Sequence, residues 1–119
     1  LLALETLKML DNNVKRRNES VKLYKSQLSK IPGVSFQKIN EDNTSTFKDF
    51  SVFINKEEFL MDRNELSNAL LKENIITKKY FYPPLHKQAA YRDLSKNLDN
   101  LEVTNEISEN VLSLPLFFR

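Results

Sequence analysis

Glycine is nearly absent from this chain, which contains one in 119 residues. Average usage is about 7%. Loops that cradle phosphate groups depend on glycine, because the missing Cβ lets the backbone approach the anion closely. The sequence shows neither a GxGxxG nor a Walker pattern. A phosphate-bearing ligand or cofactor would therefore have to be held mainly by residues outside this chain.

Cysteine is missing altogether, and His86 is the single histidine. Disulfides and thiolate chemistry are thereby excluded, and the composition is compatible with a reducing cytosol. A zinc site would need carboxylates for nearly all its ligands, which is an uncommon arrangement. The net charge is only +2, and no apolar run approaches the roughly 20 residues that span a bilayer. Neither nucleic acid nor a membrane is therefore expected as a partner.

Apolar residues in the first quarter of the chain recur at alternating spacings of three and four, which predicts one long helix over residues 1–30. The residues on this face are Leu7, Leu10, Val14, Val21, Tyr24 and Leu28, with Arg17 among them. No capping residue precedes Leu1, so the helix is expected to begin inside a longer element. Pro32 and Gly33 are expected to end it.

Alternating apolar residues predict strands at 34–36 and 50–54, joined by a polar loop, and a third strand at 75–77. Asp62 and Glu65 form a capping-box pattern, which predicts a helix that ends with Asn74 in the left-handed conformation. Thr104 is expected to cap a last helix that runs to about Leu112. The chain is expected to close with the apolar segment 114–118.

Together these elements predict an α+β fold in a single domain over residues 1–119. It would consist of a long N-terminal helix, a small, mainly antiparallel sheet of about three strands, and helices packed on one face of the sheet.

The most distinctive stretch is residues 78–86, KKYFYPPLH. Its two prolines fix φ and remove two backbone donors, so the stretch can neither continue a strand nor enter a helix. We expect a stiff, extended arm that holds Tyr80, Phe81, Tyr82 and His86 in fixed directions. Such an arm could form one side of a ligand pocket, or it could be a hydrophobic connector that happens to carry aromatic residues.

Four motifs in order resemble one known family. They are the interval from Arg17 to Tyr24, the helix from Arg63 to Ile75, the segment Tyr82-Pro83-Pro84-Leu85-His86-Lys87-Gln88, and the close Leu112-Ser113-Leu114-Pro115. This series resembles the C-terminal small domain of the DegT/DnrJ/EryC1/StrS aminotransferases. Members of this family depend on pyridoxal phosphate and act on nucleotide-linked keto-sugars.

The resemblance implies a piece of a larger cytoplasmic enzyme, whose missing large domain binds pyridoxal phosphate and carries the Schiff-base lysine. None of the lysines here stands in the family's Schiff-base context, so the isolated chain is expected to be inactive. The full-length enzyme is expected to be a homodimer that transfers an amino group, from glutamate, to a nucleotide-linked keto-deoxysugar used in polysaccharide or O-antigen biosynthesis. Which sugar, which nucleotide and whether C3 or C4 is aminated stay open.

The resemblance also implies that Tyr82 and His86 line the substrate pocket, with Tyr80, Phe81 and Tyr91 as further candidates. A tyrosine or histidine suits a sugar, because the ring covers C–H groups while the polar tip hydrogen-bonds hydroxyls or phosphate. Some family members have histidine where Phe81 stands, and phenylalanine cannot take over a polar role there.

Two other functions are compatible with parts of this sequence. A small α+β ligand-binding regulatory module without catalysis would keep the same elements, but it predicts a self-contained first helix with its own cap. A nucleic-acid binder could use the basic run at 15–17 with the aromatics at 80–82 as a stacking platform. These two groups lie on separate predicted elements and the charge is nearly balanced, so this reading is the least favoured.

Overall fold

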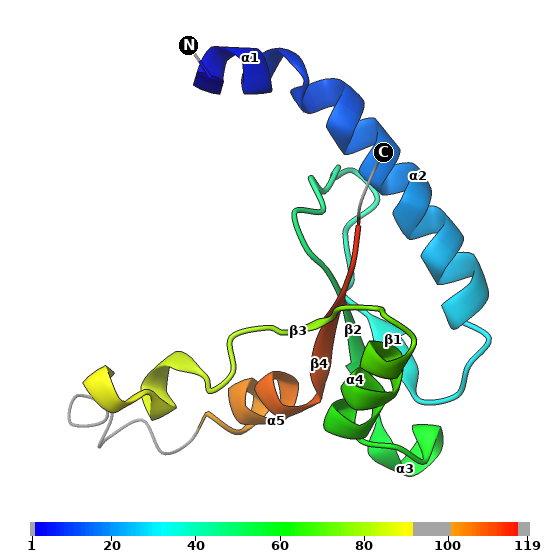
Figure 1. Ribbon diagram of the computed structural model, residues 1–119, viewed down its shortest axis with the longest axis vertical. Helices are drawn as coiled ribbons and strands as arrows, with labels where there is room; N and C mark the ends of the chain where they lie inside the picture. The colour runs from blue at the N-terminus through cyan, green and yellow to red at the C-terminus, as the bar shows by residue number, and fades with distance from the viewer. Residues whose placement is uncertain (1, 92–100, 117–119) are drawn as a thin grey trace.

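A four-stranded antiparallel sheet forms the centre of the computed structural model, which describes residues 2–91 and 101–116. Its strands are β1 (Val34–Phe36), β2 (Phe50–Ile54), β3 (Lys78–Lys79) and β4 (Val111–Leu114), in the order β1-β2-β4-β3 (Figure 1). The α+β class and the mainly antiparallel sheet are confirmed. The predicted number of about three strands is one too low.

The core lies on the face of the sheet that carries Phe50, Val52 and Ile54, all at most 2% exposed. Val52 stands opposite Leu112 on β4, and both are completely or almost completely buried. The ring of Phe50 stacks on that of Tyr24 at 5.3 Å between centroids. This face is therefore the one that the N-terminal helix covers.

The N-terminal helix is two helices rather than one, α1 (Leu2–Lys8) and α2 (Leu10–Leu28), with the break at Met9 (Figure 1). Leu4 and Leu7 are 59% and 63% exposed, whereas Val21 on α2 is buried. Helices in proteins are held mainly by packing of an apolar face, and the face of α1 has little to pack against among the described residues. The apolar spacing therefore predicted the helical state correctly, but not one continuous axis.

The motif residues Arg17 and Tyr24 connect α2 to the rest of the fold through hydrogen bonds. The Arg17 guanidinium donates a hydrogen bond to the Thr46 carbonyl at 3.3 Å, and the Tyr24 hydroxyl donates to the Pro115 carbonyl at 3.1 Å. One contact holds the loop before β2, and the other holds the segment after β4.

Helix α4 (Arg63–Lys72) begins as predicted, with Asp62 as its N-cap. The Asp62 carboxylate accepts hydrogen bonds from the backbone N–H groups of Asn64 and Glu65, and the Glu65 carboxylate accepts one from the Asp62 N–H. Asn74 has φ 61°, which confirms the expected left-handed residue. A short helix, α3 (Lys56–Phe59), was not predicted; Asn55 caps it by accepting from the Glu57 N–H.

Three predictions for the second half of the chain are wrong in detail. The third strand lies at Lys78–Lys79 and not at 75–77. Helix α5 (Glu102–Asn110) contains Thr104 in its interior, and Leu101 precedes it without a side-chain cap. The helix ends before Val111, because β4 pairs with β2 on one side and β3 on the other. These pairings connect residues far apart in sequence, so local spacing does not reveal them.

No helix in the described part of the chain is long and apolar enough to cross a membrane.

Candidate functional site

The aromatic arm (residues 80–91) leaves β3 and lies beside α5, away from α2 (Figure 1). Pro84 is extended, with φ −62° and ψ 156°, as expected for the Pro-Pro pair. The 3₁₀ turns η1 (Leu85–Lys87) and η2 (Ala89–Tyr91) follow it directly. The prediction of an extended arm is therefore wrong, because Phe81 has φ 47°, in the left-handed region, and His86 lies in a turn.

Helix α5 is the platform that holds the arm. The Ser108 hydroxyl donates to the Phe81 carbonyl at 2.9 Å, and His86 Nε2 lies 3.0 Å from Asn105 Oδ1. Lys87 Nζ lies 3.8 Å from a carboxylate oxygen of Glu109. The three α5 residues are spaced by three and one, so they share one face of the helix. The arm is thus attached at its beginning and in η1.

Two cationic side chains lie over the Tyr82 ring. The guanidinium carbon of Arg63 lies 4.5 Å from the ring centroid, and Lys79 Nζ lies at 5.9 Å. Tyr82 is 50% exposed, whereas Arg63 is 2% exposed. Tyr82 therefore lies against a buried cation and is itself about half exposed.

Arg63 is also bound to the end of α5. Its Nη1 donates to the Ser108 carbonyl at 3.0 Å and to the Val111 carbonyl at 3.4 Å. Burial lowers the pKa of Arg63, and the neighbouring Tyr82, Asp62 and Glu109 partly offset this. Even so, an arginine stays charged in any ordinary buffer. The site therefore contains a fixed buried cation.

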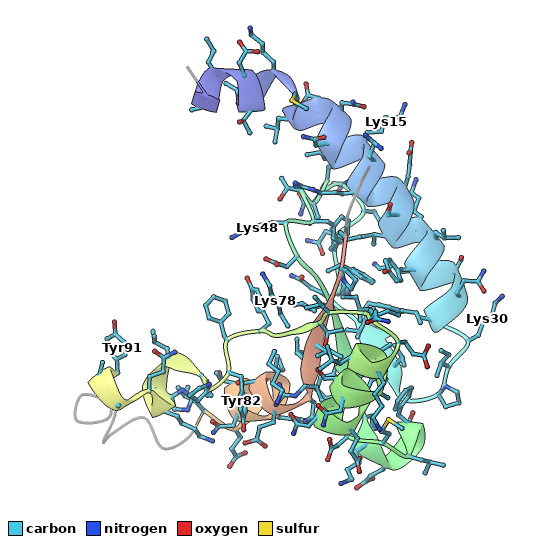
Figure 2. All side chains as sticks on the ribbon, in the orientation of Figure 1. Lys15, Lys30, Lys48, Lys78, Tyr82 and Tyr91 are labelled. Carbon is cyan, nitrogen blue, oxygen red and sulfur yellow. The ribbon has the colours of Figure 1, made fainter. Side chains whose placement is uncertain are left out.

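The five predicted site residues do not all lie together. Tyr80 and Phe81 meet edge to face, with ring centroids 4.5 Å apart, and Tyr82 contacts Arg63. His86 is half-buried against α5. Figure 2 shows Tyr91 at the outer end of the arm, away from Tyr82. The structure thus places four of the residues along the inner part of the arm and Tyr91 apart from them.

Arg63, Asn105 and Ser108 were not predicted as site residues. In the sequence, Arg63 is part of a helix motif, and its position directly after an N-cap suggests a surface residue. The spacing of Asn105 and Ser108 could have indicated a polar helix face. Nothing in the sequence indicated that the aromatic arm lies against it.

The described residues contain neither a cluster of metal ligands nor an enclosed lysine. No group of three or more histidine, cysteine, aspartate or glutamate residues among them could hold a metal ion. The described lysine side chains are exposed apart from Lys25, which is half-buried and lies over the Phe36 ring at 5.7 Å. A lysine that reacts with a cofactor aldehyde is normally enclosed with it.

The model of the DegT/DnrJ/EryC1/StrS aminotransferase family matches residues 1–119. The chain belongs to this family. Among its relatives is the dTDP-4-amino-4,6-dideoxy-D-glucose transaminase of Escherichia coli, which is 32% identical over 112 residues, or 93% of this chain and 30% of that protein. The corresponding Shigella dysenteriae transaminase is 29% identical over 92% of this chain and 29% of its own length.

Solved structures of the family share the fold described above. An aminotransferase from Brucella abortus has a TM-score of 0.80 and 26% identity, over 95% of this chain and 28% of its own. DesV of S. venezuelae, solved in complex with a ketimine intermediate, has a TM-score of 0.82 and 26% identity, over 92% of this chain and 28% of its own. The chain therefore spans about 30% of the length of the curated relatives that it matches. The resemblance found in the four motifs is confirmed.

Proposed function

We propose that residues 1–119 are the small C-terminal domain of a pyridoxal-phosphate-dependent aminotransferase that acts on a nucleotide-linked keto-deoxysugar. Membership of the family and the dTDP-sugar transaminases among the relatives support the reaction class. The observation that carries a substrate-binding role is the aromatic arm, which α5 holds in place while Tyr82 stays half exposed. The amino donor is glutamate, as is general in the family.

In this proposal the arm is a wall of the sugar-nucleotide pocket. The Tyr82 ring covers C–H groups of the substrate, and its hydroxyl and the His86 imidazole hydrogen-bond hydroxyl or phosphate oxygens. Tyr80, Phe81 and Tyr91 extend the wall. Phe81 contributes apolar contact and excludes water, because it has no polar group.

The rest of the full-length protein binds the pyridoxal phosphate and supplies the Schiff-base lysine, because the described lysines of this chain are not enclosed. This chain alone is accordingly inactive. The full-length enzyme is a homodimer that works in the cytoplasm, and the small domain contributes surface to the dimer as well as the pocket wall.

The first experiment is an absorbance titration of the full-length protein with pyridoxal phosphate, before and after glutamate. A Schiff-base band that converts to the pyridoxamine band supports the aminotransferase, and turnover of a dTDP-linked keto-sugar supports the substrate class. If the full-length protein gives no band, the aminotransferase proposal is wrong. The arm would then belong to a ligand-binding module without catalysis.

The pocket wall is tested by Tyr82→Phe and His86→Gln in the same protein. Lys72→Gln, at the exposed end of α4, is the control. Both arm variants are expected to raise KM for the nucleotide sugar by about tenfold, as the loss of one substrate hydrogen bond does, and to leave conversion by glutamate within twofold. Arm variants that behave like the control would refute the pocket role of the arm.

A further inference from the structure

Arg63 is a cation buried without an ion pair. It is 2% exposed, and no carboxylate of the described chain lies within ion-pair distance of its guanidinium. Asp62 and Glu109 act on it only from farther away. Removing a charge from water without a direct partner is costly, so such a residue is expected to be held by other interactions.

Two kinds of contact stabilise the guanidinium. Nη1 donates to the Ser108 carbonyl in the last turn of α5, where unpaired carbonyls and the helix dipole favour a cation, and to the carbonyl of Val111, the first residue of β4. The guanidinium carbon lies over the Tyr82 ring, 4.5 Å from the ring centroid. Its Nε has no acceptor among the described residues. The orientation of the guanidinium is therefore fixed by α5 on one side and by Tyr82 on the other.

We propose that Arg63 is a positioning residue of the substrate pocket: anchored to α5, its guanidinium fixes the orientation in which the Tyr82 ring faces the substrate. This role rests on the proposed function, in which Tyr82 lines that pocket. In the chain, Tyr82 follows Phe81 and precedes the Pro-Pro pair. The Ser108 hydroxyl donates a hydrogen bond to the Phe81 carbonyl. The Tyr82 backbone is thus tied to α5, and Arg63 supplies the matching contact for its side chain.

Lysine cannot substitute for Arg63 in this role. A guanidinium is planar, so it can donate to two carbonyls along its edge while its face stacks on a ring. An ammonium is a compact point charge that does not stack. Arg63→Lys therefore keeps a charge that can still lie over a ring, but it loses the planar group that binds two carbonyls and holds the ring in one orientation.

The first test follows the ring and does not depend on activity. 3-Fluorotyrosine is incorporated at position 82 of the full-length protein, and its fluorine resonance is recorded with and without Arg63→Lys. Arg17→Lys is the matched control, since Arg17 also donates to a backbone carbonyl but lies on α2. The resonance is expected to move or broaden with Arg63→Lys and to stay in place with Arg17→Lys. An unchanged resonance in both variants overturns the proposal.

The second test measures both half-reactions of the same variants. Arg63→Lys is expected to raise KM for the nucleotide sugar about 5- to 30-fold, the range that corresponds to a desolvated cation–π contact, and to leave conversion by glutamate within twofold. In a double-mutant cycle, adding Arg63→Lys to Tyr82→Leu is expected to raise KM little further. Effects that multiply, or an equal loss in both half-reactions, would mean that Arg63 only supports the fold.

If Arg63→Lys lowers the melting temperature too far for kinetics, Arg63 is kept and the ring is changed. Phenylalanine with zero, one, two or three ring fluorines is placed at position 82, which weakens the cation–π contact step by step. KM for the nucleotide sugar is expected to rise along this series, and a flat series overturns the proposal. A protein with no transaminase activity refutes the proposed function, while the fluorotyrosine spectrum still decides whether Arg63 orients the ring. If the fluorine resonance changes with Arg63→Lys but KM for the nucleotide sugar does not, Tyr82 lies outside the pocket and the positioning role is overturned.

Discussion

Replacing Ser108 with alanine is expected to loosen the aromatic arm without unfolding the sheet. Ser108 is buried, and its hydroxyl donates to the Phe81 carbonyl at 2.9 Å. Phe81 has φ 47°, in the left-handed region, which costs a residue with a side chain about 1–2 kcal/mol. The hydrogen bond therefore holds a backbone conformation that Phe81 would not adopt by itself.

The size of the effect follows from the single bond that is lost. A hydrogen bond of this kind contributes about 1 kcal/mol net, which corresponds to about a fivefold change in the equilibrium between the attached and the open arm. The contact of Arg63 is retained, because it uses the Ser108 backbone carbonyl, and alanine keeps that carbonyl. The strain at Phe81 stays as well, so nothing offsets the loss.

The assay is native-state amide hydrogen exchange in the full-length protein. The N–H groups of Lys87, Gln88 and Tyr91, which donate to backbone carbonyls within the arm, are expected to exchange about fivefold faster in Ser108→Ala. Amides of β2 and β4 are expected to exchange at unchanged rates. Ser26→Ala is the control, because the Ser26 hydroxyl also donates to a backbone carbonyl, but on the exposed side of α2. Unchanged exchange in the arm, or equal acceleration in arm and sheet, would refute the reasoning.

Three further predictions concern the scaffold, and the same exchange experiment on the sheet amides measures each. Leu112→Ala is expected to lower the free energy of opening the sheet by about 2–5 kcal/mol, because Leu112 is 0% exposed, while Leu71→Ala at an exposed position changes it by less than about 0.5 kcal/mol. Gly33→Ala is expected to destabilise by more than about 1 kcal/mol, since φ is 77° and a Cβ would lie 2.5 Å from the backbone nitrogen of Phe59. The hydrogen bond from the backbone N–H group of Glu65 holds the pKa of Asp62 below its ordinary value of 3.8. The ionised cap therefore stabilises the fold at neutral pH, and this stabilisation is lost as the pH falls through the lowered pKa. The difference in stability between the native protein and Asp62→Asn is accordingly expected to shrink below about pH 4, and a constant difference would contradict this.

The sequence by itself determined the features that depend on neighbours within about one helical turn. Asp62 and Glu65 form the predicted capping box, and Asn74 adopts the left-handed conformation, because these choices depend on local hydrogen bonds and φ preferences. The alternation at Phe50–Ile54 identified the central strand and its buried face for the same reason. The motif series, although spread along the chain, was sufficient to indicate the family.

Only the tertiary structure decided how these elements meet. Val111–Leu114 is a strand and not the end of a helix, because β2 and β3 offer it backbone partners on both sides. The face of α5 that carries Asn105 and Ser108 acquires a role only when the arm lies against it. Arg63 is separated from the Ser108 and Val111 carbonyls it binds by more than 40 residues, and no local pattern shows that a residue at a helix start will be buried under a tyrosine. Contacts between distant segments are fixed by packing of the whole chain, which is why the sequence could name Tyr82 and His86 but not the residues that hold them.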